Sequence, residues 1–85
     1  MARAKEQYPE LYRLFGQMLV EEREAAGLSQ SEVARRLSKP PSAVWKYENG
    51  ELRLDMIEFL ALARAIGFEP LDFMRRLMAI GIQKD

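Results

Sequence analysis

Single glycines and prolines divide this chain into five short segments, and no other feature of the sequence restricts its fold as strongly. Glycine favours the left-handed backbone that ends many helices, and proline suits the first residue of a helix. Four glycines each follow a segment with helical periodicity, and three prolines each stand where a helix can begin: Gly27, Gly50, Gly67, Gly81, Pro9, Pro41 and Pro70. No segment alternates apolar and polar residues, so we predict an all-α fold.

The helix starts are marked by side chains that can cap them. Ser29 with Glu32, and Asp55 with Glu58, have the spacing of a capping box, in which each residue of the pair accepts a hydrogen bond from the backbone of the other. With the apolar periodicity, these signals predict five helices over residues 9–26, 30–37, 41–49, 56–66 and 70–80.

The composition excludes several classes of protein. At 85 residues and 9.8 kDa, the chain has room for one domain, which we take to span residues 1–85. It contains no cysteine and no histidine, which removes thiolate chemistry and the commonest general base and transition-metal ligand. We therefore expect no enzymatic activity, no metal and no cofactor. No apolar run is long enough to span a membrane and the first nine residues are polar, so we expect a cytoplasmic protein.

Two carboxylate pairs have a spacing that could hold Mg²⁺, namely Glu21 with Glu24 and Asp55 with Glu58. A solvated helix face explains the first pair, and a capping box explains the second. A catalytic site requires convergent polar groups, and neither pair has them. We interpret neither pair as a metal or catalytic site.

The segment from Gln30 to Glu48 carries the most specific functional signal. Two short predicted helices are joined by about four residues, 38–41. The first helix has the small residue Ala34 in the middle of its inner face, which lets the second helix cross it closely. This is the arrangement of a helix-turn-helix, in which the second helix enters the DNA major groove.

The second of these helices has two different faces. Val44 and Tyr47 form the predicted buried face. The outer stripe places a hydroxyl, an indole, an ammonium and an amide at i, i+3, i+4 and i+7: Ser42, Trp45, Lys46 and Asn49. These groups suit contacts with base edges and phosphates. An ordinary solvated face is the alternative, and Trp45 argues against it because an exposed indole usually has a partner.

Charge supports this interpretation only locally. The whole chain balances 13 Lys and Arg against 13 Asp and Glu. Between Arg35 and Arg53, however, there are five basic residues and two acidic ones. A positive surface of this kind is what phosphate binding requires. Arg3 and Lys5 could extend it as an N-terminal arm, although disorder is the simpler interpretation of these residues.

A series of short motifs runs from Gly27 to Gly67. The motifs are Gly27-Leu28-Ser29-Gln30, Glu32-Val33-Ala34, Lys39-Pro40, Ser42, Val44, Lys46-Tyr47-Glu48, Gly50, Arg53, Leu54-Asp55, Glu58-Phe59 and Ala63-Arg64-Ala65-Ile66-Gly67. In this order and spacing they resemble the Cro and phage-repressor family of helix-turn-helix regulators, also called the XRE family. The resemblance covers roughly residues 12–77. It implies a five-helix lambda-repressor-like DNA-binding domain whose recognition helix, residues 42–49, lies in the major groove.

The resemblance also implies roles for individual residues. Base contacts are expected from Pro41, Ser42, Trp45 and Lys46. Phosphate contacts are expected from Gln30, Lys39, Asn49 and Arg53. Arg23 and Glu48 match a pair that forms a partly buried salt bridge between the first and third helices.

Three features depart from the family pattern. Ser38 occupies a turn position usually held by glycine, which implies strain if its φ is positive. Pro40 replaces the usual Ser or Thr N-cap, so a capping hydrogen bond is lost. Pro41 and Trp45 replace polar base-reading side chains, which favours apolar contact with thymine methyl groups or sugars.

The last predicted helix carries two apolar stripes. The first stripe is Phe73, Leu77 and Ile80. The second stripe is Leu71, Met74 and Met78. One stripe can pack on the domain, and the other then needs a partner, which predicts a symmetric dimer through the second stripe. A single broad buried face is the alternative.

Together these features predict a dimeric transcriptional regulator, with a repressor as the expected role, that binds an inverted-repeat operator in double-stranded DNA. Two alternatives stay open. One is the antitoxin of a toxin–antitoxin pair, which would have a toxin as its protein partner. The other is a protein–protein interaction module that has lost specific DNA binding. No membrane partner is expected.

Overall fold

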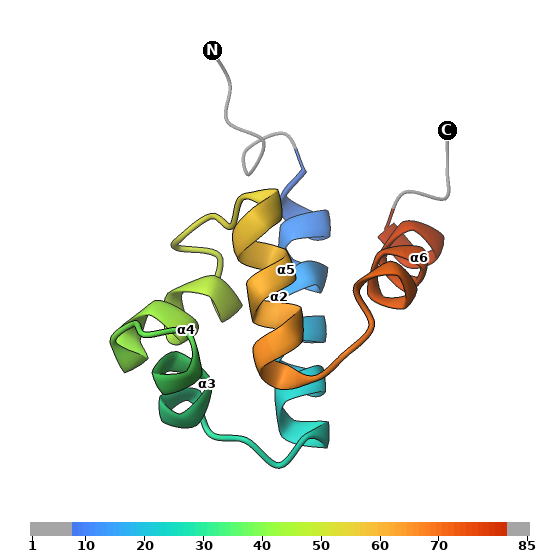
Figure 1. Cartoon of the computed structure of the whole chain (residues 1–85). Coiled ribbons are helices and arrows are strands. Elements are labelled where there is room, and N and C mark those ends of the chain that lie inside the picture. The colour runs from blue at the N-terminus through green and yellow to red at the C-terminus, as the bar shows by residue number, and fades with distance from the viewer. Residues whose placement is uncertain (1–7, 82–85) are drawn as a thin grey trace.

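The computed structural model describes residues 8–81, which form five helices and no strand (Figure 1). In chain order the helices are α2 (Pro9–Ala25), α3 (Gln30–Arg36), α4 (Pro41–Glu48), α5 (Met56–Ile66) and α6 (Pro70–Gly81). The predicted all-α fold with five helices is confirmed, and each boundary lies within one residue of its predicted position. Arg3 and Lys5 lie outside the described residues.

Both predicted capping boxes are present. The backbone N–H of Glu32 donates to Oγ of Ser29 at 3.1 Å, and the backbone N–H of Ser29 donates to Oε1 of Glu32 at 2.9 Å. Asp55 and Glu58 make the same pair of bonds at 2.7 and 3.0 Å. The backbone N–H of Ser29 is the main cause that lowers the pKa of the Glu32 carboxyl, because it stabilises the charged form.

The glycines at the helix ends behave as predicted at three of four positions. Gly27, Gly50 and Gly67 have φ of 73°, 74° and 99°, in the left-handed region. Gly81 is the exception, because it is the last residue of α6 and does not have a positive φ. It lies against Leu11 of α2, where an added Cβ would overlap the leucine side chain. The glycine therefore marks a close contact between helices rather than a left-handed helix end.

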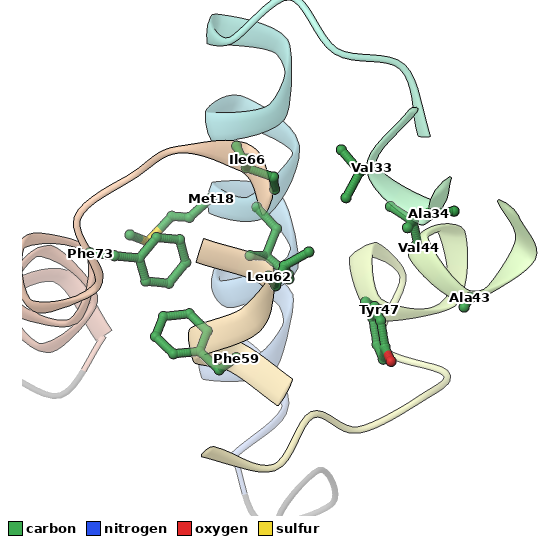
Figure 2. Packing of buried hydrophobic residues seen from close by; sticks show 11 residues of the cluster. Met18, Val33, Ala34, Ala43, Val44, Tyr47, Phe59, Leu62, Ile66 and Phe73 are labelled. Atoms are coloured by element: carbon green, nitrogen blue, oxygen red, sulfur yellow. The ribbon is translucent and has the colours of Figure 1, made fainter. Parts of the chain in front are cut away.

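The five helices enclose one apolar core (Figure 2). In Figure 1, α3 and α4 lie on one side of α2 and α5, and α6 lies on the other side. The rings of Phe15, Phe59 and Phe68 surround the fully buried ring of Phe73, with centroids 5.6, 5.3 and 5.0 Å from it. This cluster holds α6 to the rest of the domain. In residues 8–81 no helix is both long enough and apolar enough to cross a membrane.

Candidate nucleic-acid interface

Helices α3 and α4 pack closely and are joined by a short turn. Val33 and Ala34 of α3 are fully buried, as are Val44 and Tyr47 of α4 apart from a small exposed fraction. Because the side chain of Ala34 is small, α4 packs closely against α3, as predicted. The turn between the helices contains Ser38 with φ of 57°, so the condition under which strain was expected at this position is met.

The outer face of α4 is presented to solvent by this packing. Ser42, Trp45 and Lys46 are exposed, and 44% of the Trp45 surface is accessible. Pro41, the first residue of α4, is also exposed, and Pro40 before it makes no side-chain cap, as predicted. These residues form the candidate interface. Their expected contacts with bases stay predictions.

The orientation of α4 is set by a network around the Glu48 carboxylate. Arg23 of α2 donates from Nε to Oε2 of Glu48 at 2.6 Å and from Nη2 to Oε1 at 3.3 Å. The Arg23 and Glu48 side chains are only 12% and 4% exposed. The ion pair expected from the family resemblance is therefore present and largely buried.

Gln30 belongs to the same network, which was not predicted. Its Nε2 donates to Oε1 of Glu48 at 2.8 Å, so the first residue of α3 is bound to the last residue of α4. Asn49 also has an internal partner, because its Nδ2 donates to the backbone carbonyl of Trp45 at 2.9 Å. Both residues were expected to contact phosphates. Each has one amide N–H already used within the protein.

Gly16 is a residue that the sequence analysis missed. It lies in the middle of α2, where an added Cβ would overlap the carbonyl oxygen of Glu48. Glycine at this position lets α2 touch the C-terminal end of α4 directly. The one available signal was a lone glycine inside a strongly periodic helical segment, which often has a packing reason.

Three basic residues near α4 are exposed to solvent. Lys39, Lys46 and Arg53 are exposed and take part in none of the ion pairs among residues 8–81. Arg23 neutralises one of the two acidic residues of this region, Glu48. The surface near α4 is therefore positive, although the chain as a whole carries no net charge. Such a surface attracts phosphates.

Helix α6 keeps part of its apolar surface in solvent. Leu71 and Met78 are 58% and 59% exposed, while Met74 is half-buried against the core. These exposures contradict the alternative of one broad buried face. The expected inward stripe is also wrong in one residue, because Ile80 is exposed. Along this face Phe73 is buried and Leu77 is partly buried, and the exposed Gly81, at i+8, lies against Leu11 of α2.

A second exposed apolar surface on α5 was not predicted. Met56, Ile57 and Leu60 are exposed, and 72% of Ile57 is accessible. Ile57 and Leu60 border a groove between α3 and α5 that Arg36 and Arg64 also line. The sequence showed that these positions are apolar, but the periodicity of α5 did not show which of them α3 would leave uncovered.

Comparison with known proteins gives consistent matches to one kind of fold. A family profile described as a helix-turn-helix domain matches residues 14–77. An XRE-family like protein from Pseudomonas syringae pv. tomato str. DC3000 is 42% identical, with 89% of this chain and 93% of that chain covered and a TM-score of 0.82. The restriction-modification controller protein C.AhdI from Aeromonas hydrophila is 36% identical, with 78% and 98% covered and a TM-score of 0.68. Comparison with the curated proteins gives no significant match.

Proposed function

The chain belongs to the XRE-type helix-turn-helix family, whose fold is that of DNA-binding transcription regulators, and from this premise we propose that it binds one specific double-stranded DNA sequence as a dimeric regulator. The observation that carries the proposal is the outer face of α4. There an indole, a hydroxyl and an ammonium are exposed on a helix that a buried ion pair fixes to α2. A helix held in this way can enter the major groove without losing its orientation.

The proposed contacts divide into base contacts and phosphate contacts. Bases are contacted by the exposed face of α4, with Pro41, Ser42, Trp45 and Lys46. Phosphates are contacted chiefly by Lys39 and Arg53, which stand before and after α4 and are exposed. Gln30 and Asn49 each use one side-chain amide N–H in an internal hydrogen bond. They therefore contribute to phosphate binding only through their second amide N–H.

The proposed dimer forms through Leu71, Met74 and Met78 of α6, of which Leu71 and Met78 are exposed and Met74 is half-buried. Exposed apolar side chains at this spacing form a patch that a second copy can cover. Two copies related by a two-fold axis present two α4 helices, which read half-sites about 34 Å apart on one face of the duplex. A dimer bound there occupies its operator, and repression is the regulatory role we propose.

The test begins with selection from a random duplex library by the purified protein, followed by sequencing. We expect enrichment of an inverted repeat whose half-sites are about one helical turn apart. Affinity for this sequence is then measured as a function of salt for the wild type, Lys46→Ala and Arg53→Ala. Arg75→Ala is the matched control, because it also removes one exposed positive charge but lies on α6, away from α4.

A phosphate contact has a defined signature in this experiment. Each one that is lost lowers the slope of log affinity against log salt by about 0.9. A dimer loses one such contact in each half-site, so we expect about twice that reduction for Arg53→Ala. We expect an unchanged slope for Arg75→Ala. Lys46→Ala either lowers the slope or relaxes the choice of one base, depending on whether its ammonium meets a phosphate or a guanine. If no sequence is enriched and all variants bind alike, specific DNA binding is wrong and a protein–protein role takes its place.

A further inference from the structure

Trp45 is the residue on the face of α4 whose chemistry best identifies a base. Resting on the proposed function, we infer that Trp45 determines sequence specificity by contacting thymine methyl groups in each half-site. The operator is then chosen through apolar contact at those positions rather than through amide hydrogen bonds to adenine.

The first step concerns the amides near α4. Adenine is commonly read by one Asn or Gln side chain that donates and accepts at the same time. The amide of Gln30 is bound to Glu48 inside a partly buried network. The amide of Asn49 is turned back onto the carbonyl of Trp45. Both side chains are therefore held by the protein, and neither is placed to form a two-bond contact with adenine.

The second step concerns the apolar surface that takes their place. Pro41 and Trp45 are four residues apart in α4 and therefore lie on the same face, one turn from each other. Both are exposed. Proline offers no backbone N–H, and the indole offers one donor on a large apolar ring. In the major groove the C5-methyl of thymine is the apolar group that a base presents, so this strip matches thymine.

The third step concerns how firmly the indole is held. Val44 precedes Trp45 and Tyr47 lies two residues after it, and both side chains are almost completely buried. The Asn49 amide closes the last turn of α4 on the Trp45 carbonyl. Glu48, three residues after Trp45, is fixed by Arg23. The helix backbone that carries the indole is thus pre-organised, so the indole starts from a defined position on α4 when it meets a base with or without a methyl group.

The experiment removes the methyl groups one at a time. Each thymine of the selected operator is replaced singly by deoxyuridine, which keeps the hydrogen-bonding edge and lacks the methyl. For the wild type we expect a loss of affinity of about fourfold at one or two positions in each half-site, the value for about one buried methyl-sized group. In Trp45→Ala the overall affinity falls, and deoxyuridine at those positions has no further effect. Trp45→Phe keeps an apolar ring and is expected to retain the sensitivity.

A direct contact is tested in parallel. Bromodeoxyuridine carries bromine in place of the methyl and cross-links to adjacent aromatic side chains in ultraviolet light. At the sensitive positions we expect a cross-link to the peptide that contains Trp45. This is the single tryptophan of the chain, so quenching of its fluorescence by the operator duplex provides a second reading.

The outcomes separate the inference from the function on which it rests. If an operator is enriched but no deoxyuridine substitution weakens wild-type binding, the inference is wrong and DNA binding stands. It is also wrong if the same sensitivity persists in Trp45→Ala. If Trp45→Ala binds DNA too weakly to measure, the inference is tested by the deoxyuridine series with the wild type and by the cross-link to the Trp45 peptide. Absence of either signal then contradicts it. If no operator is enriched and the fluorescence does not respond to DNA, both ideas are wrong, and the indole faces a protein partner.

Discussion

Glu48 is the residue at which three helices meet. Its carboxylate receives hydrogen bonds from Arg23 of α2 and Gln30 of α3, while its own position ends α4. Arg23 also donates from Nη1 to the carbonyl oxygen of Leu28 at 3.0 Å, and this bond holds the loop before α3 in place. One carboxylate thus fixes the relative positions of α4, the proposed recognition helix, and the two helices that support it.

Replacing Glu48 by glutamine keeps the shape of the side chain and removes its charge. We expect Glu48→Gln to lower the free energy of unfolding by about 3 kcal/mol, because the largely buried guanidinium of Arg23 loses its counter-charge. Urea unfolding followed by circular dichroism measures the change. Glu51→Gln is the control, since this exposed residue in the following loop should change stability by less than about 0.5 kcal/mol. Equal effects of the two variants would show that solvent screens the Arg23–Glu48 pair.

Gly16 shows how one missing Cβ decides the distance between two helices. We expect Gly16→Ala to destabilise the protein by about 1–3 kcal/mol, because the new methyl overlaps the carbonyl oxygen of Glu48 and forces α2 and α4 apart. Alanine is otherwise the better helix former, so the sign of the effect reports the contact. Gln17→Ala, at the exposed neighbouring position, should be neutral or slightly stabilising in the same unfolding experiment. A stabilising Gly16→Ala would contradict this close packing.

At the scale of elements, the turn between α3 and α4 combines strain with strong constraint. Ser38 adopts a left-handed φ of 57° without being glycine. Three backbone bonds hold the turn, from Ser38 to Arg35, from Lys39 to Ala34, and from Ala43 to Pro40. The two helices therefore impose a conformation that serine by itself disfavours.

Ser38→Gly should relieve this strain. The left-handed conformation costs an L-residue roughly 1–2 kcal/mol, and glycine avoids this cost. Glycine also has more conformational freedom in the unfolded chain, which offsets part of the gain in stability. We therefore expect a net stabilisation of about 0.5–1 kcal/mol, measured as a higher denaturant midpoint with the same slope. Ser31→Gly makes the same exchange inside α3 and should lower stability by a similar amount. Two changes of the same sign would mean that φ at Ser38 has no energetic consequence.

The capping box of α3 adds a dependence on pH. Hydrogen bonds from Ser29 lower the pKa of Glu32, so the folded state favours the carboxylate more than the unfolded state does. The stability that this contributes is present at neutral pH, above the ordinary carboxyl pKa, and is lost as the pH falls through the lowered pKa. We expect Glu32→Gln to be less stable than the wild type at neutral pH and to approach it in acid. Denaturant midpoints measured for both proteins across this range test the expectation, and a constant difference would refute it.

At the scale of the whole molecule, two exposed apolar surfaces are candidates for the interface of the proposed dimer. One is on α6, with Leu71 and Met78, and the other is on α5, with Ile57 and Leu60. Burying a glutamate at an interface is strongly unfavourable, because its charge loses water without gaining a partner. A pair of matched variants can therefore distinguish the two surfaces.

We expect Leu71→Glu to convert a dimer into a monomer at tens of micromolar protein, and Ile57→Glu to leave the dimer intact. Equilibrium sedimentation measures the masses. Both substituted positions are exposed in the single chain, so neither variant should impair folding. The opposite result would move the interface to α5. A wild type that sediments only as a monomer would exclude the proposed dimer on either surface.

The positions of the helices were predictable because the signals that set them act locally. The capping boxes at Ser29 and Asp55 each involve a residue three positions away, and the left-handed turns at Gly27 and Gly67 involve the glycine itself. The buried face of α4 at Val44 and Tyr47 followed from periodicity. The Arg23–Glu48 pair, which spans two distant helices, came from the family resemblance and not from any local pattern.

Features that depend on residues far apart in the chain became visible only in the folded protein, because helix packing brings those residues together. It placed the Gln30 amide on Glu48, gave Gly16 its contact with α4, turned Ile80 into solvent and left Ile57 uncovered. Periodicity identifies which side chains share a face, but burial of that face requires another helix at the right distance and angle. Local signals along the chain were enough to predict the helices, most of their ends and the family. Helix packing set which polar groups and apolar surfaces are available for the proposed DNA and dimer contacts, because those are the groups that no other helix covers.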